Sequence, residues 1–519
     1  MLTQSAAGKS GAWEDIDVAQ ASPAEAERLS LKTKLAFGIG SAAETIALFA
    51  VTSYALLFYN QVLGVNAAWV GLAISASLVF DGLTEPIVGS WSDRTKSKWG
   101  RRHPWMFAAP IPIALAFFAI FSPPASLGEL GLAVWCGVTV SVLRQVMTFF
   151  HTPHLALGGE LSPNYVERSK VMAYNSFFTW AGGAGMTYVA LTFFFPKTEE
   201  FHNGLLNPEP WNEFAATMAV VVIAVLFASA WFTRDRIPYL PKPAADTPKF
   251  SPAEFFKDIG KALTNVNYVW LLAGYFFLSM MLGLREGLRI YTYSYYWEIS
   301  SSDMRLFIIG SFLGYATAFA FAARMHGRFD KKATAIWSAV AYAVIPTIPI
   351  VLGQMGVLGP DTPGLLAILI AFATFAYAAV SVLQISIMSA LADIADENEL
   401  KYGVRQEGIL YSTRALAAKL DQAIGTALAG FVIALIAFPD RAQPGQVAPE
   451  ILNNLALWDG LLAAVPGLIA AWCYGRYRID RQAYEVTREA LAKRRAEAMT
   501  VAAQGTPPAT GGVAVAPAE

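Results

Sequence analysis

The chain has 519 residues, of which 55% are hydrophobic and only 15% are charged, and its formal net charge is −1. Soluble domains carry about a quarter charged residues, so a soluble multidomain protein is excluded. There is no surplus of Lys and Arg to neutralise phosphates, which excludes a nucleic-acid-binding protein. The two cysteines, Cys136 and Cys473, lie far apart in apolar runs and predict neither a disulfide framework nor a metal site. A protein of the lipid bilayer is the class that remains.

Residues 1–30 are polar and acidic without an apolar core, so we expect a cytoplasmic tail rather than a secretory signal peptide. From Leu35 onward, apolar stretches of about 20 residues follow one another, and each is long enough to cross a bilayer as a helix. The sequence therefore predicts an all-α membrane protein with twelve transmembrane helices. The expected spans are 35–63, 67–92, 104–123, 130–157, 170–196, 212–233, 265–297, 304–325, 333–353, 364–392, 407–437 and 455–477.

Basic residues gather in the loops after the second, fourth, sixth, eighth and tenth spans, whereas the opposite loops hold only Lys197, Arg305 and Arg441. Cytoplasmic loops retain Lys and Arg, so we expect both termini in the cytoplasm. The long polar segment midway along the chain predicts two six-helix halves, an arrangement that many secondary transporters use. The expected parts are a tail at 1–30, a first bundle at 31–233, a cytoplasmic loop at 234–264, a second bundle at 265–477 and a cytoplasmic tail at 478–519.

Ionisable side chains occur inside the predicted spans, where each costs about 2.5–3.5 kcal/mol on insertion scales and normally faces a partner or a wet cavity. Besides His151 there are five acids and five bases, which indicates an interior paired network that also meets a solute. They are Glu44, Asp81, Glu85, Glu286 and Asp421, together with Arg144, Arg285, Arg289, Arg414 and Lys419.

The second span places Asp81, Thr84 and Glu85 at i, i+3 and i+4, on one face of a helix. Two carboxylates so close repel each other unless Na⁺, a shared proton or a basic side chain lies between them. We therefore expect a coupling cation, Na⁺ or H⁺, at Asp81 and Glu85. The alternative is that both acids pair with Arg144 or Lys419 and only hold helices together.

The fourth span carries Arg144, Thr148 and His151 on one face, and the Thr148 hydroxyl could add an oxygen to the cation site. His151 titrates near neutral pH and could carry a proton, or it could serve as a neutral hydrogen-bond donor.

The seventh span aligns Arg285, Arg289, Thr292 and Tyr296 on one face. Guanidinium groups donate several hydrogen bonds in fixed geometry and an aromatic ring stacks on a sugar, so this stripe predicts a site for a polar, ring-shaped solute. Alternatively, Arg285 pairs with an acid such as Glu44 and never touches the solute.

The run from Asp81 to Trp105 contains Gly-x-x-x-Asp-Arg at Gly89, Asp93 and Arg94, followed by Gly100-Arg101-Arg102. It resembles the glycoside-pentoside-hexuronide:cation symporters, a branch of the major facilitator superfamily that includes melibiose permease and is related to sucrose transporters. A second match is the acidic stretch 393–405, expected as a loop. The resemblance covers about residues 31–480 and implies the major facilitator fold. It also implies a gate on the cytoplasmic side at Gly89, Asp93, Arg94, Arg101, Arg102, Asp393 and Glu407.

Position by position, the resemblance puts Asp81, Glu85 and Thr148 at the family's cation site and Lys419 beside it, with Thr84 replacing an Asn. The sugar-binding positions of melibiose permease are not kept, since Glu44, Thr45 and His151 stand at three of them. The Arg285-Glu286 pair resembles one in sucrose transporters. The residues that we expect to line the solute cavity are Glu44, Thr45, Arg144, His151, Arg285, Arg289, Tyr296 and Arg414.

The sequence thus predicts a symporter that couples H⁺ or Na⁺ to a sugar or glycoside by alternating access. We expect no further cofactor, no structural metal and no catalytic residue, and we expect a monomer in a plasma membrane such as the bacterial inner membrane. Two alternatives stay open: a transporter of another solute, such as an organic anion or a lysolipid, and a membrane sensor that transports nothing.

Overall fold

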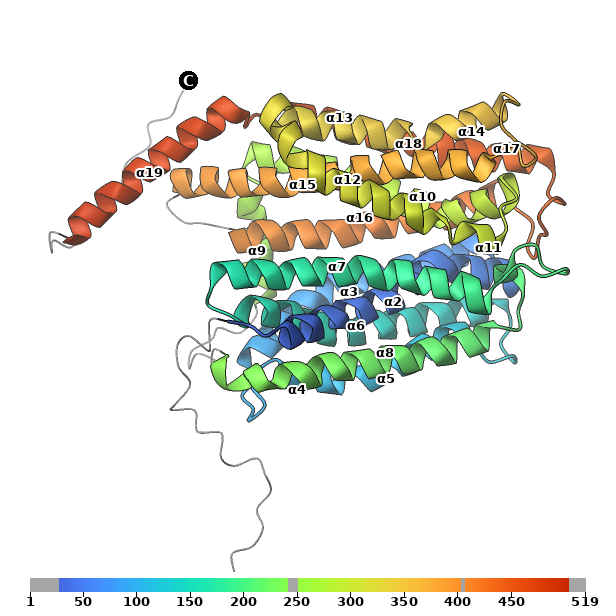
Figure 1. Cartoon of the computed structure of the whole chain (residues 1–519), viewed down its shortest axis with the longest axis horizontal. Helices are drawn as coiled ribbons and strands as arrows, with labels where there is room; N and C mark the ends of the chain where they lie inside the picture. Colours follow the sequence, from blue (N-terminus) through green and yellow to red (C-terminus); the bar gives the residue numbers. More distant parts are fainter. Residues whose placement is uncertain (1–27, 241–250, 403–406, 504–519) are drawn as a thin grey trace, which may run out of the picture.

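The computed structural model describes residues 28–240, 251–402 and 407–503, and within them long helices run side by side in one elongated bundle (Figure 1). The elements of the first half are α2 (Leu31–Leu57), η1 (Phe58–Val62), α3 (Ala67–Arg94), α4 (His103–Ala108), α5 (Pro110–Phe121), α6 (Glu129–Glu160), α7 (Tyr165–Val189), η2 (Ala190–Phe194), η3 (Gly204–Leu206), α8 (Trp211–Thr233) and η4 (Arg234–Tyr239).

The elements of the second half are α9 (Pro252–Ala262), α10 (Val266–Tyr291), η5 (Thr292–Tyr296), α11 (Ser301–Met304), α12 (Phe307–Phe329), α13 (Lys331–Val344), α14 (Thr347–Gln354), α15 (Leu365–Tyr402), α16 (Glu407–Leu435), α17 (Pro449–Leu457), η6 (Trp458–Leu462), α18 (Ala463–Arg476) and α19 (Arg481–Ala503). Four of the short elements, η1, η2, η5 and η6, are π-helical turns that continue a long helix.

Eleven helical segments in the described parts of the chain are long and apolar enough to cross a membrane. They coincide with eleven of the twelve predicted spans. The segment at the remaining one, α7 with η2, is of similar length but richer in Gly, Ser, Thr and Asn, and it lies among the other helices (Figure 1). The all-helical membrane fold predicted from the sequence is confirmed.

The helices associate in two sets that correspond to the two halves of the chain. In the first half α2 packs on α7 and α8, and α3 packs on α6; in the second, α10 packs on α16 and α18, and α15 packs on α12 and α13. The most extensive contact between the halves joins α3 to α16. These two helices approach closely because glycines face each other: a Cβ at Gly71 would lie 3.0 Å from the Gly430 Cα.

The chain differs from the predicted pattern in one segment, and two of the predicted connecting parts contain helices. The prediction of a loop from Asp393 onward is wrong for the described residues, because α15 continues to Tyr402. The predicted central loop contains η4 and α9, and the predicted C-terminal tail begins as the helix α19. The rest of the predicted tails and loops, at 1–27, 241–250, 403–406 and 504–519, lies outside the described residues.

The two ends of the bundle differ in how the halves meet. We call the end at which α2 begins and α18 ends the near end; it lies on the left in Figure 1, and the opposite end is the far end. At the far end, Tyr291 donates to Asn60 Oδ1 (2.9 Å) and Tyr295 donates to Gln61 Oε1 (3.0 Å), which joins η1 to α10 and η5. All four side chains are buried, so the far end is sealed between the halves.

Candidate functional site

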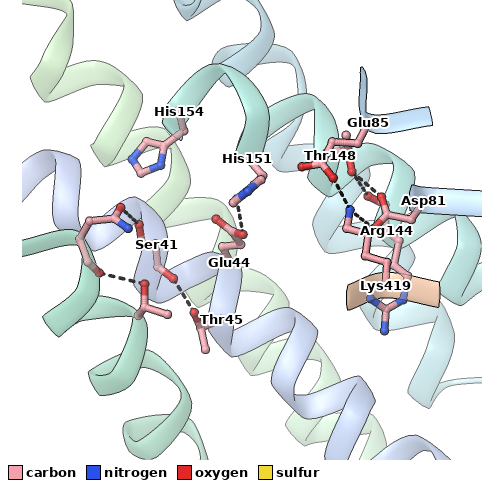
Figure 2. A network of polar contacts seen from close by, with 12 residues as sticks. Ser41, Glu44, Thr45, Asp81, Glu85, Arg144, Thr148, His151, His154 and Lys419 are labelled. Atoms are coloured by element: carbon pink, nitrogen blue, oxygen red, sulfur yellow. Dashed lines mark hydrogen bonds and ion pairs between the residues drawn. The ribbon is translucent and has the colours of Figure 1, made fainter. Parts of the chain in front are cut away.

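A buried carboxylate forms the centre of the site in the first half. Asp81 on α3 is 5% exposed. Its Oδ1 accepts a hydrogen bond from the Thr148 hydroxyl of α6 (2.6 Å), and its Oδ2 contacts the Lys419 ammonium of α16 (2.7 Å). The same ammonium lies 2.8 Å from Glu85 Oε2, one turn farther along α3. Lys419 therefore bridges both carboxylates and links the two halves of the bundle (Figure 2).

Thr84 and Arg144 lie next to this bridge but do not take part in it. The Thr84 hydroxyl, expected beside the carboxylates, donates instead to Gln145 Oε1 on α6 (2.6 Å). Arg144 is 7% exposed, and in the described residues its Nε and Nη2 have no hydrogen-bond partner. The sequence offered Arg144 and Lys419 as partners for Asp81, and in the described structure Lys419 forms the ion pair.

A second acid–base pair lies beside the bridge, between α2 and α6. His151 Nδ1 is 2.5 Å from Glu44 Oε1. Figure 2 shows this pair between His154 and the Asp81 cluster. The alternative that Glu44 pairs with Arg285 is wrong, because Glu44 contacts His151. The Thr45 hydroxyl donates to the Ser41 carbonyl of its own helix (2.9 Å), and the Ser41 hydroxyl contacts Asn175.

The second half contains a separate cavity of about 110 Å³ between α10, α13, α15 and η6, lined by charged groups as well as aromatic and aliphatic side chains. Arg285, Glu286 and Arg289 of α10 line it, as do Thr292 at the start of η5 and Asp459 of η6. Glu286 Oε1 accepts from Arg289 Nη2 (2.6 Å) and from the Ser53 hydroxyl of α2 (3.1 Å), which is another contact between the halves.

Of the eight residues predicted to line the solute cavity, only Arg285 and Arg289 line this one. Glu44, Thr45, Arg144 and His151 lie in the first half, and Tyr296 and Arg414 lie outside the lining in the second. Tyr296 does not line the cavity, whereas Trp297 does. The reason is the π-helical turn η5, after which the Trp297 N–H donates to the Thr292 carbonyl five residues earlier. The extra residue in a π turn places Trp297, rather than Tyr296, on the same face as Thr292. Arg414 on α16 is also outside the lining: its Nη2 donates to the Tyr275 hydroxyl (3.1 Å), and its guanidinium lies over that ring.

Three of the five predicted gate residues of the first half, Asp93, Arg101 and Arg102, form a charged cluster with Glu160 at the near end. Arg102, which is 4% exposed, contacts Asp93 Oδ1 (2.6 Å) and Glu160 Oε1 (2.7 Å), and Arg101 contacts the same Glu160 oxygen (2.8 Å). Gly89 and Arg94 are not part of this cluster: Gly89 faces Thr152 of α6, and Arg94 donates to the Ser90 carbonyl (3.1 Å).

The second half repeats this arrangement. Lys331 at the start of α13 contacts Asp393 of α15 (2.8 Å), as Arg101 before α4 contacts Glu160 at the end of α6. In both halves, a base at or just before the start of the third membrane span contacts an acid on the fourth. The side chain of Glu407, the other predicted gate residue of this half, lies outside the described residues.

Sequence reasoning missed Asp459 and Gln145. Asp459 lies within the twelfth predicted span and is a membrane-embedded acid like the ones that were singled out, so it gave the same signal. Gln145 follows Arg144 directly, but an uncharged amide in an amphipathic pattern does not stand out.

The profile of MFS/sugar transport proteins matches residues 36–481, and the chain belongs to this family. The match confirms the resemblance found in the sequence, and the protein is a membrane transporter of the major facilitator superfamily. The chain is 24% identical to the inner membrane symporter YicJ of Escherichia coli (strain K12) over 458 residues, which are 87% of this chain and 93% of that protein.

A second relative is the isoprimeverose transporter of Lactiplantibacillus pentosus, which is 23% identical over 423 residues and covers 81% of this chain and 84% of its own. Among solved structures, a D-xylose-proton symporter superposes with a TM-score of 0.55 at 13% identity, over 86% of this chain and 96% of that one. This last likeness shows the fold alone.

Proposed function

We propose that this protein couples the entry of H⁺ or Na⁺ to the uptake of a sugar or glycoside, by alternating access in a plasma membrane such as the bacterial inner membrane. The observation that carries the proposal is the bridge from Lys419 of the second half to Asp81 and Glu85 of the first. The printed names of the relatives, a symporter and an isoprimeverose transporter, support it.

The bridge suits a coupling site because its charges are balanced without a further ion. Asp81 and Glu85 offset Lys419 and the nearby Arg144, so another cation at the carboxylates has to displace the Lys419 ammonium. Displacement breaks the charged contact between α3 and α16. Binding of the coupling ion thereby changes how firmly the two halves hold together, which is the change that alternating access requires. No further cofactor or catalytic residue has a role in this mechanism.

The conformation fits a carrier whose sites face one side of the membrane. The buried contacts of Asn60 and Gln61 with Tyr291 and Tyr295 close the far end, and the near end carries the basic loop residues. With the positive-inside rule, the near end is the cytoplasmic one, both termini are cytoplasmic, and the end closed in this state is the one away from the cytoplasm. We assign transport to the monomer, because both sites are built within one chain.

The charged groups in the cavity lining favour a hydrophilic solute over a lysolipid. Arg285, Glu286, Arg289 and Asp459 share one cavity, and an acyl chain there would deprive these charged groups of hydration. A sensor that transports nothing has no use for a charge bridge that an ion must displace.

The test is symport by cells that express the protein. External pH is recorded in lightly buffered, de-energised cells when disaccharides, glycosides and hexuronides are added with and without Na⁺, followed by radiolabelled uptake under a Na⁺ gradient. Alkalinisation by one sugar in Na⁺-free medium identifies proton coupling, and uptake that depends on the Na⁺ gradient identifies sodium coupling.

The matched variants are Asp81→Asn and Glu85→Gln, with Asp361→Asn in an exposed loop as the control. We expect the first two to abolish accumulation against a gradient while they retain exchange, because the cation site is lost but the solute cavity is not. Full accumulation by Asp81→Asn, or the absence of flux for every solute with either ion, contradicts the proposal.

A further inference from the structure

The cavity of the second half is a built site that the cation bridge does not use. It is separate from the Asp81 cluster, and its lining combines two guanidinium groups, two carboxylates and an aromatic wall. The wall consists of Tyr293, Trp297, Tyr342, Phe372 and Tyr377. A volume of about 110 Å³ has room for several water molecules at roughly 10–15 Å³ each, or for polar groups of a solute.

Arg285 is fixed in this cavity by a break in the neighbouring helix. Pro346, between α13 and α14, has no N–H to bond the Tyr342 carbonyl, which is free to accept from Arg285 Nη1 (3.3 Å). Arg285 Nη2 donates to the Ala343 carbonyl (2.8 Å) and to the Thr347 hydroxyl (2.9 Å). The Nε of this side chain, which is 7% exposed, has no hydrogen-bond partner in the described residues. The guanidinium is thus held in place by neutral oxygens.

Asp459 is held in the same cavity by two π-helical turns. It lies in η6, is 8% exposed, and its Oδ2 accepts a hydrogen bond from the Thr292 hydroxyl of η5 (2.7 Å). No ion pair within 4 Å joins it to Arg285 in the described parts of the chain, although both line the cavity. Two π turns that meet on a buried carboxylate are a local departure from α-helical geometry, and such departures are frequent at functional sites.

The charges of the lining select a class of solute. Arg285 and Arg289 supply two positive charges, and Glu286 and Asp459 supply two negative ones, so the cavity is neutral overall. A solute with its own charge upsets this balance in a buried environment, whereas a neutral polyhydroxyl ring offers donors to Asp459 and acceptors to Arg285.

We infer that this cavity binds one ring of a neutral sugar or glycoside, with Asp459 accepting from its hydroxyls, Arg285 donating to them, and the aromatic wall covering an apolar face of the ring. The inference deepens the proposed function and rests on it. It assigns Asp459 as the residue that selects neutral glycosides over hexuronides, whose carboxylate it repels.

The experiment measures binding to the purified full-length protein by isothermal titration calorimetry. Each neutral glycoside of a panel is compared with the hexuronide of the same ring. For the wild type we expect at least tenfold tighter binding of the neutral partner. Asp459→Asn should weaken binding of the neutral glycoside at least tenfold. It should also reduce the ratio between the affinities for the neutral glycoside and the hexuronide. Asp421→Asn, which changes a buried carboxylate of the same half outside this cavity, is the matched control and should leave both unchanged.

A second measurement does not depend on the stability of the Asp459 variant. Ala376 lines the cavity, and both native cysteines are buried, so the thiol of Ala376→Cys reports access to the cavity. The neutral glycoside should slow its alkylation at least fivefold, and the hexuronide should not.

Each outcome decides the question. A wild type that prefers the hexuronide, an Asp459→Asn variant that binds the neutral glycoside normally, or an unprotected thiol at position 376 overturns the inference. If the wild type still accumulates a sugar with a cation, the proposed function survives that failure. If no sugar of either kind binds or is transported, both are overturned.

Discussion

Replacing Lys419 with Met tests whether the ammonium competes with the coupling ion. The change keeps most of the side-chain volume but removes the charge that contacts Asp81 (2.7 Å) and Glu85 (2.8 Å). Both carboxylates then face Arg144 as the remaining base, and the cluster gains one net negative charge. We expect the variant to bind the coupling ion more tightly than the wild type and to transport more slowly.

The size of the effect follows from the two contacts that an entering ion no longer has to break. Hydrogen bonds to charged groups contribute about 1.5–3 kcal/mol each. Part of this is offset in the wild type, because Lys419, 23% exposed at its side chain, regains hydration when it leaves. A net gain of at least 1.4 kcal/mol, or tenfold in apparent affinity, is a conservative expectation.

The assay is the ion dependence of sugar uptake in reconstituted vesicles, read as the Na⁺ concentration or the external pH that half-saturates exchange. Lys257→Met, which changes an exposed lysine of α9, is the control. Competition between Lys419 and the coupling ion is refuted if folded Lys419→Met protein half-saturates at an ion concentration within twofold of the wild-type value. A weaker midpoint would instead make Lys419 a support of the cation site.

Two further predictions concern the ends of the bundle. Arg102→Ala removes a buried base that contacts two acids, so it should destabilise the protein by about 3 kcal/mol and lower the midpoint of thermal unfolding. Truncation of the exposed Lys170 is the control and should change the stability by under about 0.5 kcal/mol. Equal unfolding midpoints for the two variants would contradict the role assigned to Arg102. Tyr295→Phe deletes the hydroxyl that donates to Gln61 and should cost the far-end seal about 1 kcal/mol, roughly a fivefold shift toward opening. An impermeant thiol reagent added from the far side should therefore label a cysteine introduced at position 53 faster, and unchanged labelling would argue against the seal.

The sequence predicted the fold because its signal is local. Long apolar runs and alternating basic loops are legible without any knowledge of tertiary contacts. The acidic end of α15 was misjudged for the same reason: Asp393 and Glu397 are polar, but the segment has no Gly or Pro to end a helix, and Lys331 and Asn267 supply partners from other elements.

The site was predictable where helical periodicity holds and not where it breaks. Asp81, Glu85 and Thr148 lie on regular helices, and their faces meet as the spacing predicted. Tyr296 was placed wrongly because the π turn shifts the register by one residue, and sequence spacing alone does not reveal such a turn. The pairing of Glu44 with His151 depends on how α2 and α6 cross, which is a tertiary fact.

The two candidate sites act on the same interface between the halves. A cation at Asp81 competes with Lys419, and a solute hydroxyl that binds Glu286 in the second-half cavity would compete with the Ser53 hydroxyl. The cation therefore weakens the contact of Lys419 with Asp81, and the solute weakens the contact of Ser53 with Glu286. Neither ligand weakens both of these contacts between the halves. Because such coupling is reciprocal, the factor by which the cation tightens solute binding must equal the factor by which the solute tightens cation binding. Ser53→Ala removes one of the two contacts and should reduce both factors alike.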